Sequence, residues 1–402
     1  MLRVFIILLG IQLLFCLPGS AQSVFEFQGA VDFELSVGGK DSEFYWNGIN
    51  RDRTNLRFGI QTADLLGRWN ITNQWSLQSR AIVTRKLGDA FEEFRLAQLA
   101  VNWESPKKRT TLSFGRFLTP FGSFYSRLLT SDRDFVEAPL FYMYYVKVSE
   151  QVGYSTTYLS RSAIPIQGVP DWGLVSAYRF GYSNGLKAKF EFPDKSISWE
   201  VALIQAGPSF QGGISDPIYP GVSTRLTLQP TYFWKQGISF SHSGFMQEGG
   251  IDISDEVMRS SYQTMLGMDF ELGFSYWEFS GELTGVRYKV PRFDTDNQEI
   301  ISGTDLLNLE LFSGNLDLKY EPPFISGAYI AYRFDFVTYG KERFDGMEEQ
   351  RWAFPVERHS VALGYRLGEH ILFKSVASLQ SFKRTDLDFD MDSWRNTVTF
   401  YF

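Results

Sequence analysis

Apolar and polar residues alternate along most of the chain. In the segment 25–35, apolar side chains take every second position, and acidic, amide or small side chains fill the positions between them. A period of two over this length predicts a β-strand with one apolar and one polar face. The same alternation recurs in the segments 56–60, 75–83, 99–103, 224–228, 238–246, 262–272, 277–283, 328–336 and 361–367.

The lengths of these segments and of their connections indicate one architecture. Strands of about 10 residues are long enough to cross the hydrocarbon layer of a membrane when tilted, whereas strands of soluble proteins average about half that length. Short connections are expected at 70–73, 105–108, 235–237, 273–275, 321–323 and 368–370. Long ones are expected at 38–53, 119–150, 207–221, 248–260, 291–304, 340–356 and 384–392, with a shorter member at 88–93. Short turns alternating with long loops predict an all-β transmembrane antiparallel barrel.

The strand count depends on the segment 154–206. A tight hairpin at Tyr182-Ser183-Asn184-Gly185 gives about 16 strands and preserves the alternation of loop lengths, with 186–206 as one bulged strand. A turn at Pro193-Asp194-Lys195 instead gives about 18 strands with one long and one short connection exchanged. The Asn-Gly turn signal favours the first assignment.

Composition agrees with a barrel. Aromatic residues make up 17% of the chain, yet its mean hydropathy is only −0.17. A helical membrane protein would need several long apolar runs, whereas a barrel strand exposes only alternate residues to lipid. Aromatic residues also flank the short turns, as expected for an interfacial girdle: Trp69, Trp75, Trp103, Trp234 and Trp277. A secreted soluble β-protein is an alternative on composition alone.

The N-terminal segment has the layout of a secretory signal. Arg3 precedes an uncharged apolar stretch at 4–17, and Gly19-Ser20-Ala21 offers a cleavage site. We expect a signal peptide at 1–21 and an outer-membrane barrel at 22–402. A lipoprotein signal using Cys16 is the alternative, but the bulky Phe15 stands where a small residue is needed. Cleavage after Ala21 removes Cys16, the one cysteine of the chain, which excludes disulfides and thiolate metal sites from the mature protein.

Net charge narrows the classes of partner. The chain has 39 Lys and Arg against 46 Asp and Glu and contains no basic run, so nucleic acid is not an expected partner.

Two resemblances concern particular residues. The last strand ends on Phe402, with Trp394, Val398 and Phe400 on the same face, which resembles the signal recognised by the machinery that assembles outer-membrane barrels. A second block resembles porin-type barrels related to the phosphate-selective porins, including Bacteroidetes relatives. It consists of Phe94-Arg95-Leu96-Ala97-Gln98-Leu99, Gly115-Arg116-Phe117-Leu118-Thr119-Pro120-Phe121-Gly122 and Pro139-Leu140-Phe141-Tyr142.

This resemblance implies a constricted channel. In that family the loop after the block folds into the lumen, so the segment 121–145 is expected to narrow the pore; an external lid is the alternative. The family often forms trimers, which implies a homotrimer. The charged candidates at the constriction are Arg127, Asp132, Arg133, Asp134 and Glu137.

Strand parity predicts which charges face the lumen. The main wall candidates are Arg57, Arg80, Arg179, Arg225, Asp269, Glu271, Arg333 and Lys374. Other acidic candidates on this face include Glu34, Glu200, Glu278, Glu282 and Asp335, and other basic ones include Lys187, Lys189 and Arg395. Because acids and bases are about equally frequent, the anion selectivity of the phosphate-selective relatives is not carried over.

The expected function is therefore passive diffusion of small polar solutes or ions through an outer-membrane porin in contact with lipid. The leading alternative is a plugged barrel that binds or anchors at the cell surface. Catalysis, metals and cofactors are not expected, since the chain has three histidines and no metal-ligand spacing. An outer-membrane phospholipase would need a serine partner for His242, but Ser241 and Ser243 fall on the opposite face of the strand.

Overall fold

The computed structural model describes residues 24–39, 56–85, 91–127, 129–150, 152–155, 174–178, 181–193, 196–205, 220–246, 253–294, 299–300, 306–343, 349–382 and 392–402. The expected signal peptide at 1–21 lies outside these ranges.

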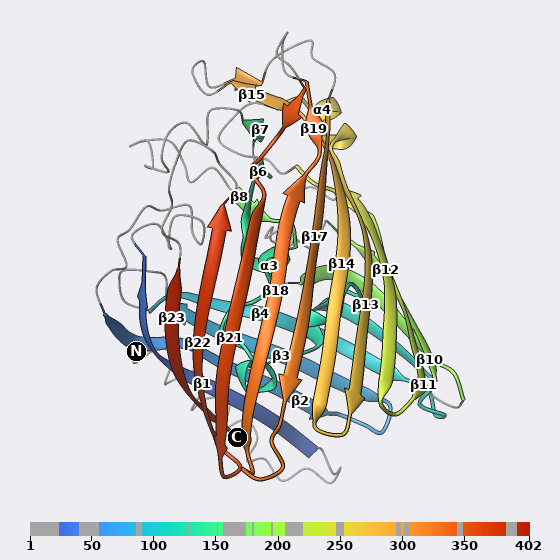
Figure 1. Ribbon diagram of the computed structural model, residues 1–402. Helices are drawn as coiled ribbons and strands as arrows, with labels where there is room; N and C mark the ends of the chain where they lie inside the picture. Colours follow the sequence, from blue (N-terminus) through green and yellow to red (C-terminus); the bar gives the residue numbers. More distant parts are fainter. Residues whose placement is uncertain are drawn as a thin grey trace.

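Sixteen antiparallel strands form a closed barrel in which neighbours in the sheet follow one another along the chain (Figure 1). Strand β1 pairs with β23, and the backbones of Gly29 and Phe402 exchange two hydrogen bonds of 3.0 Å at the seam. The strands are β1 (Val24–Gly38), β2 (Arg57–Asn70), β3 (Trp75–Arg85), β4 (Phe91–Glu104), β5 (Thr110–Leu118), β9 (Tyr182–Glu191), β10 (Ile197–Ile204), β11 (Gly221–Thr231), β12 (Trp234–Gly244), β13 (Tyr262–Phe274), β14 (Trp277–Val290), β17 (Leu307–Tyr320), β18 (Ala328–Tyr339), β21 (Val356–Leu367), β22 (Ile371–Phe382) and β23 (Ser393–Tyr401).

The count of sixteen is confirmed, but the hairpin predicted at 182–185 is wrong. Asn184 and Gly185 lie inside β9, and the chain turns at 192–196 instead. Gly185 meets a packing need, because a Cβ there would collide with the carbonyl oxygen of Leu203 on β10. The total stays at sixteen because the connection from β5 to β9 adds no strand to the wall.

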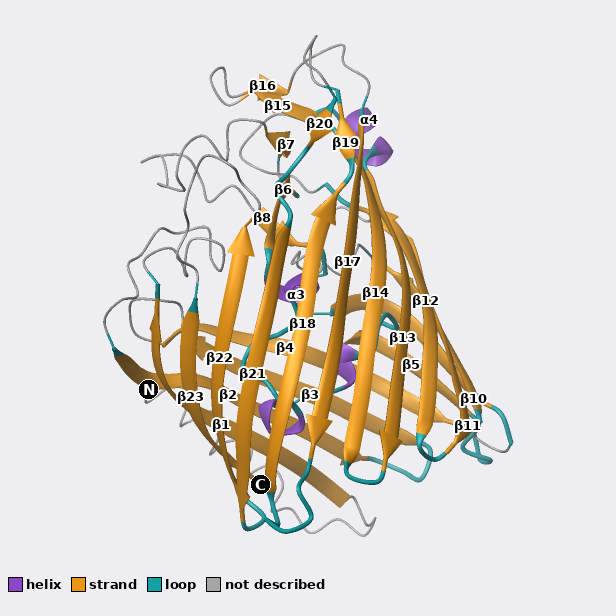
Figure 2. Cartoon of the chain, in the orientation of Figure 1, coloured by secondary structure: helices purple, strands orange, loops and turns teal. Residues whose placement is uncertain are grey.

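Connections alternate in length as predicted, but the short turn expected at 235–237 is wrong: these residues lie in β12, and the turn lies at 232–233. Short turns, such as those between β13 and β14 and between β21 and β22, gather at one end of the barrel (Figure 2). The described parts of the longer connections lie at the other end or inside the barrel. We refer to the two ends as the short-turn end and the long-loop end.

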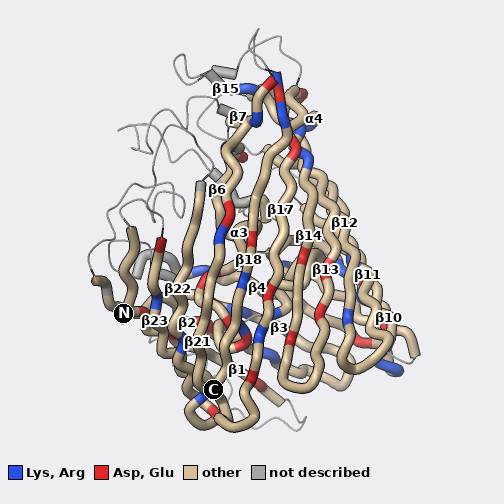
Figure 3. Tube along the Cα trace, viewed as in Figure 1, with Lys and Arg blue, Asp and Glu red and all other residues tan. Residues whose placement is uncertain are grey.

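The two faces of the wall differ as the alternation requires. On β13, Leu266, Met268 and Phe270 are exposed on the outer face, whereas Met265 and Asp269 are buried on the inner face. Charged residues of both signs are mixed along the strands (Figure 3). A strand with an apolar outer face and a polar inner face suits a barrel with lipid outside and water or polar groups inside.

Smaller elements come from the long connections. The connection from β5 to β9 contains the 3₁₀-helices η1 (Phe124–Ser126) and η2 (Thr130–Asp132) and the helix α3 (Leu140–Met143). Its strands β6 (Tyr145–Ser149), β7 (Gly153–Ser155) and β8 (Leu174–Ser176) join β15 (Arg292–Asp294) and β16 (Glu299–Ile300) in a separate sheet. The helix α4 (Asp255–Ser260) and the strand pair β19 (Lys341–Glu342) and β20 (Gln350–Arg351) complete the long-loop end.

None of the helices in the described ranges combines the length and the apolar character that crossing a bilayer would require.

Candidate functional site: the lumen and its loop

The segment 121–145, which we call the lumenal loop, lies inside the barrel. Its helix α3 is visible between the front and back walls in Figures 1 and 2. Its polar groups bond to inner-face residues of the strands. The prediction of an in-folded loop is therefore confirmed, and the external lid is excluded for the described part of this segment.

Glu137 is the most strongly held residue of the lumenal loop. Its carboxylate accepts a hydrogen bond of 2.7 Å from Nη1 of Arg358, and the other oxygen lies 2.9 Å from Nε of Arg395. All three side chains are at most 7% exposed. The backbone next to Glu137 is held as well, because Arg333 donates to its carbonyl oxygen and Arg358 to that of Ala138. Buried charges this well paired fix the loop to β18, β21 and β23.

A second anchor is Glu282 of β14, which reaches the start of the loop. Its carboxylate accepts hydrogen bonds from the backbone amide of Ser123, at 3.0 Å, and from the hydroxyl of Tyr142. Burial, followed by the charge of Glu282, raises the pKa of Tyr142 well above its ordinary value, so this hydroxyl stays a donor. The amide of Gly122 donates to Ser239 Oγ at 3.1 Å.

The 3₁₀-helix η2 is bound to β1 and β22, which lie on the other side of this group of strands from β14. Thr130 donates to Asp32 of β1 at 2.9 Å, and Lys374 Nζ donates to the carbonyl oxygen of Thr130 at 2.7 Å. Strands β12, β14, β18, β21, β22, β23 and β1 thus all bind the loop. The loop lies against this half of the barrel.

The other loop charges have separate positions. Arg127 lies 3.5 Å from Glu278 and 3.9 Å from Asp134, and Lys319 lies 3.2 Å from Asp134. Arg133 stacks on Phe124 with its guanidinium 4.7 Å from the ring centre. Burial, followed by the positive charge of Arg80 on β3, lowers the pKa of Arg133. Asp132 is exposed, and its carboxylate bonds within its own turn.

Side-chain exposure separates the ion pairs of the inner face into two groups. Pairs away from the short turns are between 1% and 8% exposed on both sides of the barrel, as in Arg333–Asp317, Arg358–Asp335, Arg80–Asp64 and Arg225–Asp269. In contrast, Arg68–Glu104, Lys187–Glu200, Lys189–Glu191 and Lys235–Glu271 are between 17% and 38% exposed. Solvent therefore reaches the inner face of β2, β4, β9, β10, β12 and β13 mainly toward the short-turn end, where these more exposed pairs lie.

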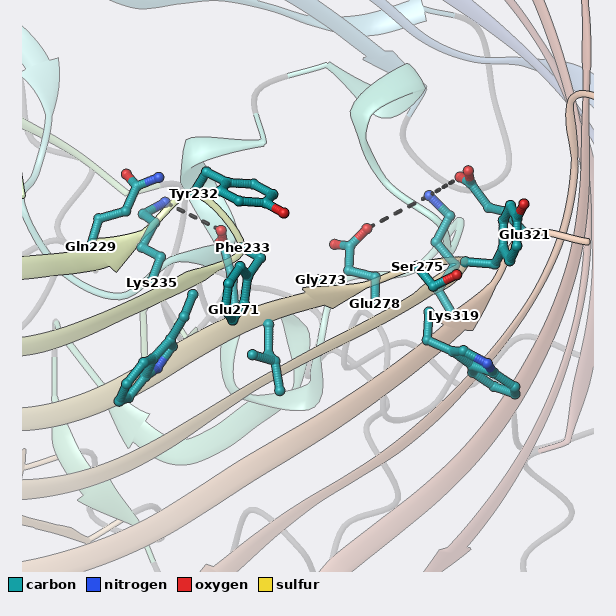
Figure 4. Close-up of a pocket in the computed structure, with 14 residues that line it drawn as sticks. Gln229, Tyr232, Phe233, Lys235, Glu271, Gly273, Ser275, Glu278, Lys319 and Glu321 are labelled. Atoms are coloured by element: carbon teal, nitrogen blue, oxygen red, sulfur yellow. Dashed lines mark hydrogen bonds and ion pairs between the residues drawn. The ribbon is translucent and has the colours of Figure 1, made fainter. Parts of the chain in front are cut away.

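A hollow of about 330 Å³ opens at the short-turn end. Figure 4 shows two sets of ion pairs across it: Lys235 with Glu271 at 3.3 Å, and Lys319 with Glu321 at 2.8 Å and Glu278 at 3.8 Å. The ring of Tyr232 lies between them. Lys319 also reaches Asp134 of the loop, so the hollow adjoins the lumenal loop.

The predicted wall residues face inward where they are described, but most are covered. Arg80, Arg225, Asp269, Arg333 and Lys374 are buried and bonded to other residues, whereas Glu271 is partly exposed to solvent. The side chain of Arg57 and all of Arg179 lie outside the described residues.

Sequence reasoning missed Arg358, which holds Glu137, because the segment 340–356 was expected to be a loop and the next strand to begin at 361. Strand β21 begins at Val356. The alternation of Val356, Arg358, Ser360 and Ala362 on one face was the signal that could have placed this residue on the wall.

The structure is similar to solved outer-membrane proteins. It matches the anion-selective porin from Comamonas acidovorans with a TM-score of 0.56 and 11% identity, over 95% of this chain and 100% of that chain. The fold is that of a porin. The outer membrane channel DcaP of Acinetobacter baumannii gives a TM-score of 0.55 at 10% identity, over 96% and 99% of the two chains. OmpT of Vibrio cholerae gives 0.56 at 8% identity, over 96% and 99%. No protein-family model matches the chain, and no curated protein matches its sequence.

The enzymatic alternatives gain no support from the porin fold. His242 is exposed on the outer face, where its Nδ1 lies 2.8 Å from Thr264 Oγ1, while Ser241 and Ser243 are buried on the inner face. The described residues contain no group of three or more His, Cys, Asp or Glu side chains that could hold a metal ion.

Proposed function

We propose that the protein is a porin of the outer membrane, through which small polar solutes diffuse passively. The observation that carries this proposal is the unequal exposure of the inner ion pairs. Pairs in the middle of the lumen are buried, whereas Arg68–Glu104, Lys189–Glu191 and Lys235–Glu271, toward the short-turn end, remain in contact with solvent. Water that reaches both a loop and a charged wall provides a path for hydrated solutes.

Planar bilayers test this function directly. Purified protein is expected to give discrete conductance steps on insertion, with the step size rising with salt concentration. Protein that inserts, migrates as a folded barrel on an unheated gel and never conducts would contradict the proposal and favour the second candidate, a plugged barrel for surface binding or anchoring. The observation behind that candidate is an apolar cluster, including Phe141, Tyr288 and Leu309, that joins the loop to the wall.

We propose that the channel is only weakly selective between anions and cations. The exposed pairs Arg68–Glu104, Lys189–Glu191 and Lys235–Glu271 place both signs along the same path. Among the loop residues, the partly buried Arg133 favours anions, and the exposed Asp132 favours cations. The reversal potential in a tenfold salt gradient is expected to stay close to zero, and a large potential of either sign would contradict this balance. We also propose that the protein is related to the phosphate-selective porins of Bacteroidetes but lacks their preference for anions.

Because the outer face is proposed to contact lipid, a charged side chain placed on it should lower the stability of the barrel. Met268 is 58% exposed at mid-height on β13. Met268→Arg is expected to destabilise the barrel by about 2–4 kcal/mol, as for arginine at the bilayer midplane. Thr264→Arg, nearer the long-loop end of the same strand and face, should cost about 0–1 kcal/mol. Urea titration in lipid vesicles measures both, and equal costs would show that this face does not meet lipid.

The remaining proposals concern export and assembly. We propose that residues 1–21 direct export and are removed, and that the assembly machinery recognises Phe402. The ring of Phe402 packs edge-on against Phe27, with centroids 6.3 Å apart, which places the C-terminus at the seam of the finished barrel. We also propose a homotrimer, because one similar structure is described as a trimer form of Vibrio cholerae OmpT.

A further inference from the structure

On the outer face of β12, β13, β14 and β17, the apolar surface ends abruptly. Residues directly opposite one another in the sheet form rows across these four strands. One row, the last apolar row, consists of Phe240, Leu266, Gly285 and Phe312. The next row toward the long-loop end, which we call the polar row, consists of His242, Thr264, Arg287 and Glu310.

The height of the apolar surface identifies what lies beside the polar row. On β14 the outer face begins at Trp277, beside a short turn, and Arg287 follows ten residues later. At about 3.3 Å per residue and a tilt of about 40°, this distance spans about 25 Å, the height of the apolar band of outer-membrane barrels. The polar row therefore lies at the level of the lipid headgroups on the long-loop side.

Two basic side chains and one acidic side chain lie at or just above this level. Arg287 is 59% exposed and pairs with Glu310 through contacts of 2.5 Å and 3.2 Å. Lys289, on the row above, lies 5.6 Å from the ring centre of Tyr262, and His242 stacks beside the same ring at 5.0 Å. An exposed ion pair is worth little in water, so Arg287 can exchange Glu310 for a stronger anionic partner.

The surface below Arg287 has room for a lipid chain. A Cβ added to Gly285 would meet no atom within 4 Å, so this glycine leaves a notch on the outer face. Leu266 and Phe312 flank it directly across the sheet, and both are exposed. A notch bounded by apolar side chains and topped by two cations matches an acyl chain that ends in a phosphate.

We propose that Arg287 and Lys289 form a binding site for the phosphate headgroup of a lipid in the outer leaflet. Tyr262 of β13 lies between these two side chains and β12. The guanidinium would bind the phosphate oxygens in bidentate fashion, Lys289 would supply the second charge, and one acyl chain would fill the notch at Gly285. This inference rests on the membrane placement proposed above, and it does not depend on conduction.

Native mass spectrometry tests the site with the full barrel in detergent. The probes are diphosphorylated lipid A, the same lipid without its phosphates, and phosphatidylcholine. Wild type is expected to retain diphosphorylated lipid A in preference to the other two, and Arg287→Gln/Lys289→Gln should reduce its retention by about tenfold or more, because both charged contacts to the phosphate are lost. Lys107→Gln, which removes a charge at a short turn, should bind like wild type.

Several outcomes would overturn the proposal. These are equal retention of all three lipids by wild type, retention by the double variant equal to that of wild type, or a loss of equal size in Lys107→Gln. Displacement of the bound lipid by excess inorganic phosphate would assign the patch to free anions instead. Both changed side chains point outward, so unheated-gel mobility and single-channel conductance should be unaffected, which separates failure of this site from failure of the channel.

Discussion

Deletion of residues 121–145 should raise single-channel conductance several-fold. The lumenal loop covers the inner face of β14, β18 and β21 to β23, so its removal would open that half of the lumen to water. The barrel should survive, because the loop supplies no wall strand and water can hydrate the arginines that now bind it. Conductance in planar bilayers is the measurement, with the variant joined across the gap by a short Gly-Ser linker.

The loop deletion also separates the two candidate functions. A porin gains conductance, whereas a barrel blocked by another part of the chain remains silent. The control is mobility on an unheated gel, which must show a folded barrel. A folded deletion variant with the conductance of wild type would mean that the narrowest part of the path lies outside this loop.

Replacement of Glu137 by alanine should have the largest effect on stability of any single change at the lumen. Arg395 would keep Glu34, at 3.6 Å, and Arg358 would keep Asp335, but each would lose its contact with Glu137. A charge-assisted contact in a buried site is worth about 1.5–3 kcal/mol, and the substitution removes two of them. The free energy of unfolding by urea in vesicles measures the loss, and noisier open-channel current should accompany it.

The matched control for Glu137 is Glu104→Ala. Glu104 pairs with Arg68 at 3.0 Å, but both side chains are partly exposed, so the expected cost is about 0–1 kcal/mol. Equal losses in the two variants would show that the Glu137 cluster is hydrated and does not anchor the loop. Glu137→Gln should fall between them, because an amide oxygen can still accept from one arginine.

The barrel itself was predictable because its signals are local. A strand in a barrel must alternate between lipid and lumen, so the period of two assigns each residue to a face before any partner is known. The inward positions of Arg80, Arg225 and Arg333 and the outward position of His242 follow from this rule. The length of each connection is likewise a property of the sequence between two strands.

Tertiary contacts determined the features that strand alternation does not specify, such as the place of a turn and the exposure of an inward-facing charge. Asn184 and Gly185 form a turn signal in isolation, but the close approach of Leu203 places them inside a strand. Parity placed Arg333 and Lys374 in the lumen, but whether they meet water depends on a loop more than 190 residues away along the chain. Glu137 and Arg358 are 221 residues apart, so no local pattern shows that they pair. The sequence determined which side chains face inward, and packing inside the barrel determined which of them a solute can reach.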